Sequence, residues 1–375
     1  MAARTYHIQV DQSKPLAQEA ETGHNRWHED IAPIFEVEEG DRVIFDTRDA
    51  FDGQLNPSST DADVGALRLG PVHPLTGPVA VKEAKPGDLL EIKLLEIDCD
   101  PWDNWGYTAE VPGFGFLRDV FPDPYIVHWH LVGDYAESPQ LPGVRIPLAP
   151  FPGIAGLAPS TELRLRATER EAECTGRGGV ALPPDALDAV PPHGRICEEG
   201  LRTVPPREVG GNMDIKQLTP GASLFLPVYT AGGLFSTGDV HFAQGDCEAC
   251  GTAIEMRSRV HVEFKVHPGE AARRNIRSPQ FMRGEYFTSP LMAAPRRFYA
   301  TTGMSFQPEG ANESEDLTLS ARNALLSLID FIGTKGYSPQ QAYALCSVAA
   351  DLRVSQVVDV PNFIVSALLP LDIFV

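Results

Sequence analysis

Several stretches of the chain alternate apolar and polar positions directly after a glycine turn. Three of them follow the turns EEGD, KPGD and TPGA and cover residues 42–47, 89–97 and 223–229. Glycine supplies the turn conformation, and the apolar and β-branched residues that follow are typical of strands. Residues 259–266 (RVHVEFKV) alternate in the same way. The pattern therefore predicts a body built mainly of β-strands, as a sandwich or a barrel.

Two regions do not share this alternation. Residues 101–159 are rich in proline, glycine and aromatic residues and show no helical period, so we expect long ordered loops there. Residues 161–206 are charged and proline-rich, and we expect them to form a surface excursion.

The C-terminal part changes to a helical period. Apolar residues recur at helical spacing over residues 317–332, and glycines follow them. Ser338, Pro339 and Gln341 form a capping box that predicts the start of a second helix, and residues 362–370 are typical of a final strand. We therefore expect an N-terminal β domain (1–160), a second β segment (161–270) and a C-terminal α+β unit (271–375).

Composition restricts the partners and the compartment. The formal net charge of −20 would repel a phosphate backbone, so nucleic acid is not expected as a partner. This acidity serves solubility or reflects a salt-adapted host, and the sequence does not separate the two. No segment has the length of a membrane span, and the first residues lack the apolar core of a signal peptide. We expect a cytoplasmic protein with six reduced cysteines.

The densest group of reactive side chains lies in GGLFSTGDVHFAQGDCEACGTAIE. Asp239 and His241 are two residues apart, which puts them on one face of a strand, and Asp246 and Glu248 repeat that spacing. Glu255 lies in an apolar run, where a carboxylate is rarely left without a partner. Such residues bind Zn²⁺, Mn²⁺ or Ca²⁺ or act as a general base. The alternative is a polar hairpin with a solvated histidine.

Other candidates are scattered along the chain. PPREVGGNMD predicts a tight turn whose backbone amide groups are free to bind a ligand. His24 and Asp49 lie in segments whose acidic and histidine residues either bind a cation or are simply solvated. His73 lies between turns as a core, capping or site histidine, and Trp105 belongs to the aromatic loops, which line a pocket or pack in the core.

Cys247 and Cys250 form a CxxC pair. A zinc ribbon would need a second such pair, and a redox motif would need a βαβ context, and the sequence has neither. A cysteine nucleophile paired with Glu248 or Glu255 remains an alternative.

Several motifs, taken together, resemble the acetamidase/formamidase family over nearly the whole chain. They are DTRDAFDGQ, HPLTGPVAV, KPGDLLEI, PFPGIAGLAP, TVPPRE, the run from GGNMD to GTAIE, YFTSP to TTG, and the tail from AYALC to LDIF. The resemblance implies a jelly-roll-like β-sandwich with a second β domain and a small α+β unit. It also implies hydrolysis of short aliphatic amides to carboxylate and ammonia, metal ions, and oligomeric assembly. One departure is Cys247, where the family usually has glycine.

These observations give one hypothesis and two rivals. In the hypothesis a divalent metal, zinc with calcium as the alternative, activates water for attack on a small amide in a homo-oligomer. The metal ligands come from Asp214, Asp239, His241, Glu255, His24 and Asp49. The catalytic groups come from Glu248, Glu255, His241 and Asp246. The substrate-binding groups come from Gly210, Gly211, Asn212, His73 and Trp105. The rivals are a thiol-dependent amidase and a non-catalytic β-sandwich module that binds Ca²⁺.

Overall fold

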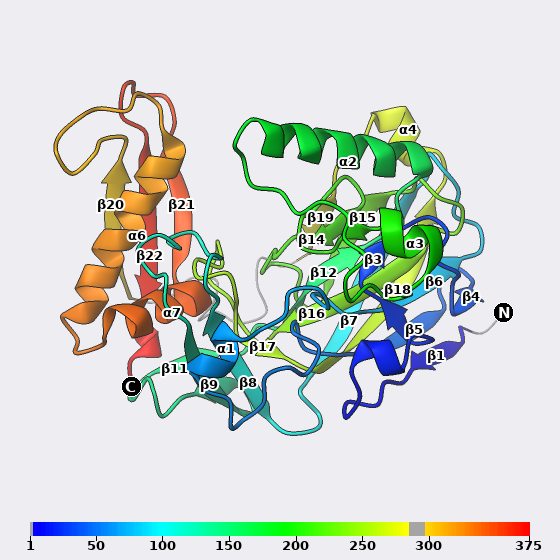
Figure 1. Cartoon of the computed structure of the whole chain (residues 1–375), viewed down its shortest axis with the longest axis horizontal. Helices are drawn as coiled ribbons and strands as arrows, with labels where there is room; N and C mark the ends of the chain where they lie inside the picture. Colours follow the sequence, from blue (N-terminus) through cyan, green and yellow to red (C-terminus); the bar gives the residue numbers. More distant parts are fainter. Residues whose placement is uncertain (1–2, 285–296) are drawn as a thin grey trace.

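The computed structural model describes residues 3–284 and 297–375 and is built mainly of β-strands, as the sequence predicts. A large β body carries a separate C-terminal unit beside it, coloured orange to red in Figure 1. The YFTSP motif at positions 286–290 lies outside the described residues.

The first sheet of the body has six strands in the order β1-β5-β18-β7-β15-β19. All neighbours are antiparallel except the parallel pair of β1 and β5. The predicted strands at 42–47, 89–97, 223–229 and 259–266 are all confirmed as members of this sheet. Its strands are β1 (Thr5–Ile8), β5 (Arg42–Thr47), β18 (Ser258–His267), β7 (Leu89–Cys99), β15 (Ala222–Pro227) and β19 (Gln280–Arg283).

The second sheet has eleven strands, and its main path runs β11-β10-β9-β8-β17-β16-β12-β14. Three further strands join it through β6, which pairs with β16, β2 and β4. Its strands are β2 (Gly23–His24), β4 (Phe35–Val37), β6 (Leu75–Val81), β8 (Trp105–Glu110), β9 (Tyr125–Val132), β10 (Tyr135–Glu137), β11 (Arg145–Pro147), β12 (Phe151–Gly156), β14 (Gly210–Asn212), β16 (Phe235–His241) and β17 (Glu255–Met256).

The two sheets pack face to face around one hydrophobic core. Phe235 of β16 makes edge-to-face contacts with Phe45 of β5 and Phe264 of β18, at ring-centroid distances of 5.6 and 5.3 Å. All three rings are fully buried. Side chains that alternate inward from both sheets fill the space between them, which is the packing of a β-sandwich. This core holds β16 rigidly, and β16 carries the group of side chains described below.

The C-terminal unit is a three-stranded antiparallel sheet with a helix on one face. Its predicted helices and final strand are confirmed, and the Ser338 side chain caps its helix by accepting from the Gln341 amide. Its elements are β20 (Phe298–Met304), α6 (Leu317–Gly333), α7 (Pro339–Ala349), β21 (Asp351–Gln356), β22 (Ile364–Pro370) and the 3₁₀ turn η2 (Leu371–Ile373).

The remaining helices and strands belong neither to the two large sheets nor to the C-terminal unit. Helix α2 crosses above it in Figure 1, and β3 pairs with β13 in a short two-stranded sheet. These elements are η1 (Leu16–Gln18), β3 (Arg26–Trp27), α1 (Asp61–Gly65), α2 (Thr161–Gly176), α3 (Gly194–Glu199), β13 (Leu201–Arg202) and α4 (Glu270–Arg274). Among the residues that the structure describes, no helix combines the length and the apolar composition needed to cross a bilayer.

One expectation about local structure was wrong. Residues 101–159 were expected to be loops, yet they contain β8 to β12, because aromatic side chains fit the half-buried surface of a sheet as readily as a loop.

Residues 161–206 were expected to form a surface excursion, and most of residues 161–188 are exposed. They contain the helix α2, which the apolar pattern did not reveal, because it buries only the side chains of Leu163, Arg164 and Ala167.

The three predicted segments are interleaved in space. Both large sheets take strands from residues 1–160 and from residues 161–270, and β19 adds a strand from the third segment to β15. Residues 298–375 form the compact unit with its own sheet. The predicted domain boundaries themselves stay a prediction.

Helix α2 is held to the body by a buried ion pair. The Arg164 guanidinium, almost fully buried, donates two hydrogen bonds to the Glu29 carboxylate at 2.8 and 3.0 Å and lies 2.8 Å from Glu199. Thr161 donates to the same carboxylate. Burial raises the pKa of Glu29, but these hydrogen bonds outweigh it and lower the pKa to about 2.

We therefore predict that Glu29→Gln lowers the free energy of unfolding at pH 7 by about 1–3 kcal/mol. A lowered folded-state pKa means that the stabilisation is fully present above the unfolded-state pKa near 4.5 and is lost as the pH falls toward 2. Urea unfolding from pH 7 to pH 2.5 measures it. Glu173→Gln, on the exposed part of the same helix, is the control. A Glu29→Gln defect that does not shrink on acidification would contradict the assignment.

Candidate functional site

Three buried side chains from two neighbouring strands converge at the centre of the larger sheet. Asp239 and His241 lie on β16, and Glu255 lies on β17 directly opposite His241. The His241 Nε2 atom is 3.3 Å from Glu255 Oε2 and 3.6 Å from Asp239 Oδ1. Strand pairing thus brings together residues that are 14 to 16 positions apart. The sequence-predicted group of Asp239, His241 and Glu255 forms one cluster.

Two more acidic residues approach the same imidazole from other segments. Glu248 lies in the loop after β16, with its Oε1 atom 3.8 Å from His241 Nε2. Asp214 follows β14, and ligand atoms of Asp214, His241 and Glu248 lie within 4.8 Å of one another. We call Asp214, Asp239, His241, Glu248 and Glu255 the acidic cluster. One imidazole is therefore surrounded by four carboxyl groups.

A glutamine fixes the orientation of the His241 ring. Gln244 donates from Nε2 to the Asp214 carbonyl oxygen at 2.9 Å, which leaves its Oε1 atom facing His241 Nδ1 at 2.9 Å. His241 Nδ1 therefore carries a proton and donates it to Gln244. The other nitrogen, Nε2, is turned toward the carboxylates, where it holds a second proton or binds a cation. This is how histidine ligands of metals are usually oriented.

Burial and crowding shift the pKa of every member of the acidic cluster. Burial raises the pKa of Glu255 and of Asp214 to about 7, partly offset by His241, and it raises that of Glu248 well above its usual range. Burial also raises the pKa of Asp239, but the neighbouring imidazoles lower it to about 2. Burial lowers the pKa of His241, yet Glu255 and Asp239 raise it well above normal. These residues by themselves would therefore share several protons.

The backbone around the acidic cluster adopts uncommon conformations. Asp214, Asp239 and Glu248 all have positive φ, at 49°, 54° and 48°. In β16 this coincides with a gap in the pairing with β12: Pro152 and Ile154 pair with Val240 and Gly238 in one continuous register, and Asp239 between them is not paired. Non-glycine residues with positive φ are uncommon and gather at functional sites. The sequence carries no signal for them.

Helix α7 positions the loop that carries Glu248. The Ser347 hydroxyl donates to the Thr252 carbonyl at 2.6 Å and accepts from the Cys250 amide at 3.1 Å. The Tyr343 hydroxyl donates to the Ala249 carbonyl at 2.5 Å. The predicted departure, Cys247, lies in this loop at φ 114°, a conformation that glycine adopts freely and cysteine does not.

Three atoms of the acidic cluster suggest what it holds. His241 Nε2, Glu255 Oε2 and Asp214 Oδ1 are buried and have no hydrogen-bond partner among the described residues. Buried polar atoms of this kind normally have a hydrogen-bond partner, so three unpartnered ones within the acidic cluster call for a ligand. An imidazole nitrogen with carboxylate oxygens is a donor set that suits Zn²⁺ or Mn²⁺. The acidic cluster therefore fits a divalent cation.

A small cavity of about 110 Å³ lies next to this group, and we call it the small cavity. His73 and Asn212 lie on its polar side together with Arg202. Asp239 raises the pKa of His73 and His241 lowers it, while burial has the larger, lowering effect. His73 is thus close enough to sense the acidic cluster. The rest of the wall is mainly apolar, with Phe51, Leu69, Val72, Val111, Phe114 and Val204.

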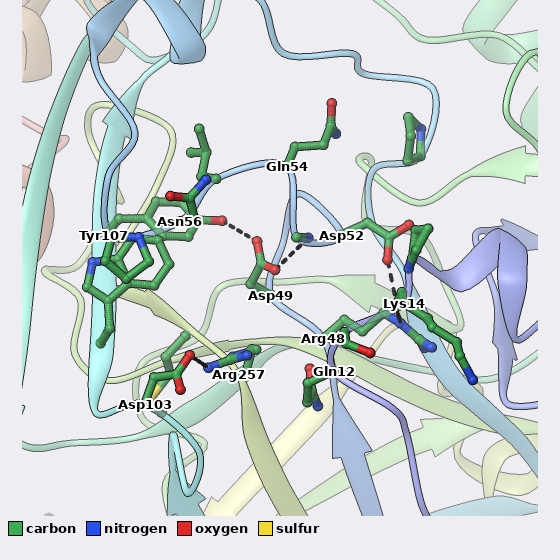
Figure 2. Close-up of a pocket in the computed structure, with 18 of the residues that line it drawn as sticks. Gln12, Lys14, Arg48, Asp49, Asp52, Gln54, Asn56, Asp103, Tyr107 and Arg257 are labelled. Atoms are coloured by element: carbon green, nitrogen blue, oxygen red, sulfur yellow. Dashed lines mark hydrogen bonds and ion pairs between the residues drawn. The ribbon is translucent and has the colours of Figure 1, made fainter.

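A larger cavity of about 390 Å³ lies elsewhere, and Figure 2 shows that its polar side chains bind one another. The Asp49 carboxylate accepts from the Tyr107 hydroxyl at 2.7 Å and from the Gly53 amide at 2.8 Å. Arg257 pairs with Asp103. Trp105 lines this cavity as well. The predicted site residues Asp49 and Trp105 are thus not brought to the acidic cluster.

Four other predicted site residues also lie outside the acidic cluster. His24 Nε2 is bound to the Ser236 hydroxyl at 2.8 Å. The Gly210 amide donates to the Arg207 carbonyl at 3.0 Å, and Gly211 pairs with Ala155 in the ladder of β14 and β12. Asp246 accepts from Gln217 at 3.0 Å. The Gly210 amide is therefore not available to a ligand.

His28, Glu29 and Asp30 form another potential metal-binding group. Glu29 is bound by Arg164, and Asp30 lies 2.9 Å from Arg195. Its carboxylates are neutralised by arginines, unlike those of the acidic cluster. We therefore assign the group a structural role.

Some residues of the site were not anticipated from the sequence. Gln244, which orients His241, and Gly153, which lies opposite Asp239, carry no spacing signal. Arg202 lies in the stretch before PPREVGG and gave no pattern of its own. Only proximity in the folded chain identifies these residues.

Comparisons with known proteins show the family to which the chain is related. The sequence profile of the Acetamidase/Formamidase family matches residues 9–375. An acetamidase of Mycolicibacterium smegmatis is 37% identical over 366 residues, covering 90% of this chain and 87% of that protein. A formamidase of Methylophilus methylotrophus is 34% identical over 380 residues, covering 96% of this chain and 91% of that protein.

Solved structures extend the comparison to the fold. The structure titled gamma lactamase from Delftia acidovorans matches with a TM-score of 0.93 and 35% identity, covering 99% of this chain and 93% of that one. A predicted acetamidase/formamidase from Thermoanaerobacter tengcongensis, 21% identical, matches with a TM-score of 0.57 over 98% of this chain and 96% of its own and shares the fold. The chain therefore belongs to the acetamidase/formamidase family of amidohydrolases.

Proposed function

We propose that the acidic cluster hydrolyses the C–N bond of a small amide with the help of one divalent cation, giving a carboxylate and ammonia. The observation that carries this proposal is that three buried ligand atoms without a hydrogen-bond partner belong to two overlapping ligand groups, which share His241, in a member of an amidohydrolase family. The non-catalytic Ca²⁺-binding module is set aside, because the family is one of enzymes. The preferred ion is zinc, given the imidazole among the ligands.

In this proposal the role of each residue follows from how deeply its side chain is buried. Asp239, His241 and Glu255 are almost fully buried and hold the cation from the strands. When bound, the cation lowers the pKa of a water molecule and polarises the amide carbonyl. Glu248 is less buried and accepts the proton of the attacking water, then delivers it to the leaving amine. Asp214 supports Glu248 and His241 from the opposite side.

The small cavity receives the substrate. Its apolar wall accommodates the acyl group, while the side chains of His73 and Asn212 contact the amide. The Oδ1 atom of Asn212 is buried without a partner, so it can accept a hydrogen bond from the NH₂ group of the amide. Oligomeric assembly and a cytoplasmic location stay predictions.

The thiol-dependent alternative has less support. Burial raises the pKa of Cys250 to about 12. Cys247 is exposed and lies beside Asp246 and Glu248, whose negative charges disfavour a thiolate. The thiolate is the nucleophile, so both groups are poorly activated. The Cys250 Sγ atom lies 3.5 Å from the Thr252 carbonyl oxygen and 3.6 Å from its hydroxyl oxygen.

The first prediction from the proposed function concerns the cation. Treatment with a chelator should abolish ammonia release from formamide, acetamide and propionamide, and Zn²⁺ should restore it. His241→Ala should lose the bound metal and lower kcat/KM by at least about 100-fold, because Nε2 is the central ligand. His130→Ala, an exposed histidine on β9, is the control. Full activity in a chain shown by elemental analysis to hold no metal would rule the mechanism out.

The second prediction concerns Gly153. A Cβ atom there would lie 2.7 Å from Asp214 Oδ1, 2.8 Å from His241 Cε1 and 2.9 Å from the Asp239 carbonyl. Gly153→Ala should therefore displace the acidic cluster and lower kcat on acetamide by about 100-fold. Gly176→Ala, where nothing lies within 4 Å, should have little effect on kcat. Circular dichroism checks that both variants fold, and normal kcat in a folded Gly153→Ala variant would contradict the geometry.

The third prediction separates the thiol alternative. Cys247→Gly removes the thiol and relieves a positive φ, so it should keep amide hydrolysis and raise the free energy of unfolding by about 1 kcal/mol. Cys250→Ala should also keep its activity. Ammonia release and urea unfolding measure the two effects. Loss of activity in a folded Cys247→Gly or Cys250→Ala variant that retains its metal would instead favour a thioester mechanism.

A further inference from the structure

Arg202 is a buried arginine with an unpartnered guanidinium nitrogen. Its residue exposure is 6%, and the one hydrogen bond of its guanidinium within the described part of the chain runs from Nη2 to the Leu69 carbonyl. Its Nε atom is buried without a partner, and no carboxylate of the described residues lies within ion-pair distance. Leaving a buried N–H donor of a charged group unpaired is costly.

The other buried arginines of the described chain are paired. Arg26, the neighbour of Arg202 across the β3–β13 pair, gives its donors to the carbonyls of Asn25, Gly70, Asp185 and Leu187. The remaining three each bind at least one carboxylate: Arg48 binds Glu19, Arg164 binds Glu29, and Arg207 binds Glu171. Burial alone therefore does not explain why Arg202 lacks a partner at Nε, whereas its position on the small cavity does.

Arg202 lines the small cavity together with His73 and Asn212. It also lowers the pKa of His73, which senses Asp239 and His241 of the acidic cluster. His73 therefore lies near both the acidic cluster and the guanidinium. The carboxylates that act on Arg202 from a distance are Asp185 and Asp188, and Asp188 is already bound to Arg68 at 2.9 Å.

Arg202 lines the small cavity directly, whereas the acidic cluster does not line it and acts on it through the neighbouring His73. The acidic cluster disfavours an anionic group close to it unless a cation intervenes, whereas the guanidinium attracts one. Arginine binds a carboxylate with two parallel hydrogen bonds in a fixed geometry. The cavity volume of about 110 Å³ has room for several water-sized groups, which is enough for a short chain between two polar ends.

We propose that Arg202 selects substrates that carry a carboxylate at the end opposite the amide, so that the preferred substrate class is the short monoamide of a dicarboxylic acid. This inference rests on the proposed amide hydrolysis at the acidic cluster. Arg202 binds the distal carboxylate, while the amide end lies against Asn212 and His73. It is a specificity-determining residue and takes no part in bond cleavage.

The test compares two isosteric substrates that differ in charge. Succinamate carries one amide and one carboxylate, and succinamide carries an amide at both ends. Wild-type protein should have the higher kcat/KM for succinamate. Arg202→Met should lower kcat/KM for succinamate by about 10- to 100-fold and should lower that for acetamide far less. Arg202→Lys should recover part of the loss, because the charge returns without the bidentate geometry.

Two controls make the outcomes distinct. Arg177→Met removes an exposed positive charge at the end of α2, away from the cavity, and should leave the substrate preference unchanged. Acetamide hydrolysis by the wild type tests the proposed function separately. If acetamide is hydrolysed but succinamate and succinamide are used equally, or if Arg202→Met affects succinamate and acetamide alike, the selection by Arg202 is wrong.

A binding measurement covers the remaining case, in which a variant misfolds or no amide is hydrolysed. Calorimetric titration of the metal-loaded wild type should give a lower Kd for succinamate than for succinamide. Arg202→Lys should reduce the ratio of the two Kd values. Selective binding of succinamate without hydrolysis of any amide would keep the carboxylate site and reject the proposed function. Equal or absent binding of the two ligands by the wild type would overturn the inference.

Discussion

The crowding of four carboxyl groups around one buried imidazole is the constraint on which the rest of the site depends. Each ionised carboxylate that leaves water costs several kcal/mol, and neighbouring ones repel each other. The acidic cluster can therefore exist only with shared protons, with a cation, or with both in exchange. Three of its buried ligand atoms have no hydrogen-bond partner among the described residues, and this favours a cation over protons held in hydrogen bonds.

The surrounding fold supplies the rigidity that such crowding needs. The two sheets pack tightly behind β16, so the carboxylates of Asp239 and Glu255 cannot move apart to relieve their repulsion. Helix α7 holds the loop of Glu248, and Gln244 locks the His241 ring. The positive φ values of Asp214, Asp239 and Glu248 are tolerated because this scaffold determines them.

A structural feature could be predicted from the sequence where it depends on residues that are close together in the chain. The strand and helix patterns and the Ser338 cap depend on nearby residues, so they predicted the mainly β body and the C-terminal helices. Asp239, His241 and Glu255 were also found, since strand spacing is a local rule. Asp49 and His24 were also named as possible ligands, yet their hydrogen-bond partners, Tyr107 and Ser236, are distant in sequence. The burial and the unmet hydrogen bonds of Arg202 likewise exist only in the folded chain.

The site separates a fixed chemical part from a variable recognition part. The acidic cluster is built largely on paired strands of the central sheet, where a change in one residue displaces several others. The wall of the small cavity comes mainly from connecting segments, such as those that carry Phe51, His73 and Phe114. Connecting segments tolerate substitution better than packed strands. The proposed hydrolytic centre and the proposed recognition wall are therefore under different physical constraints, so substitutions in the wall can change the amide that is accepted while the acidic cluster stays in place.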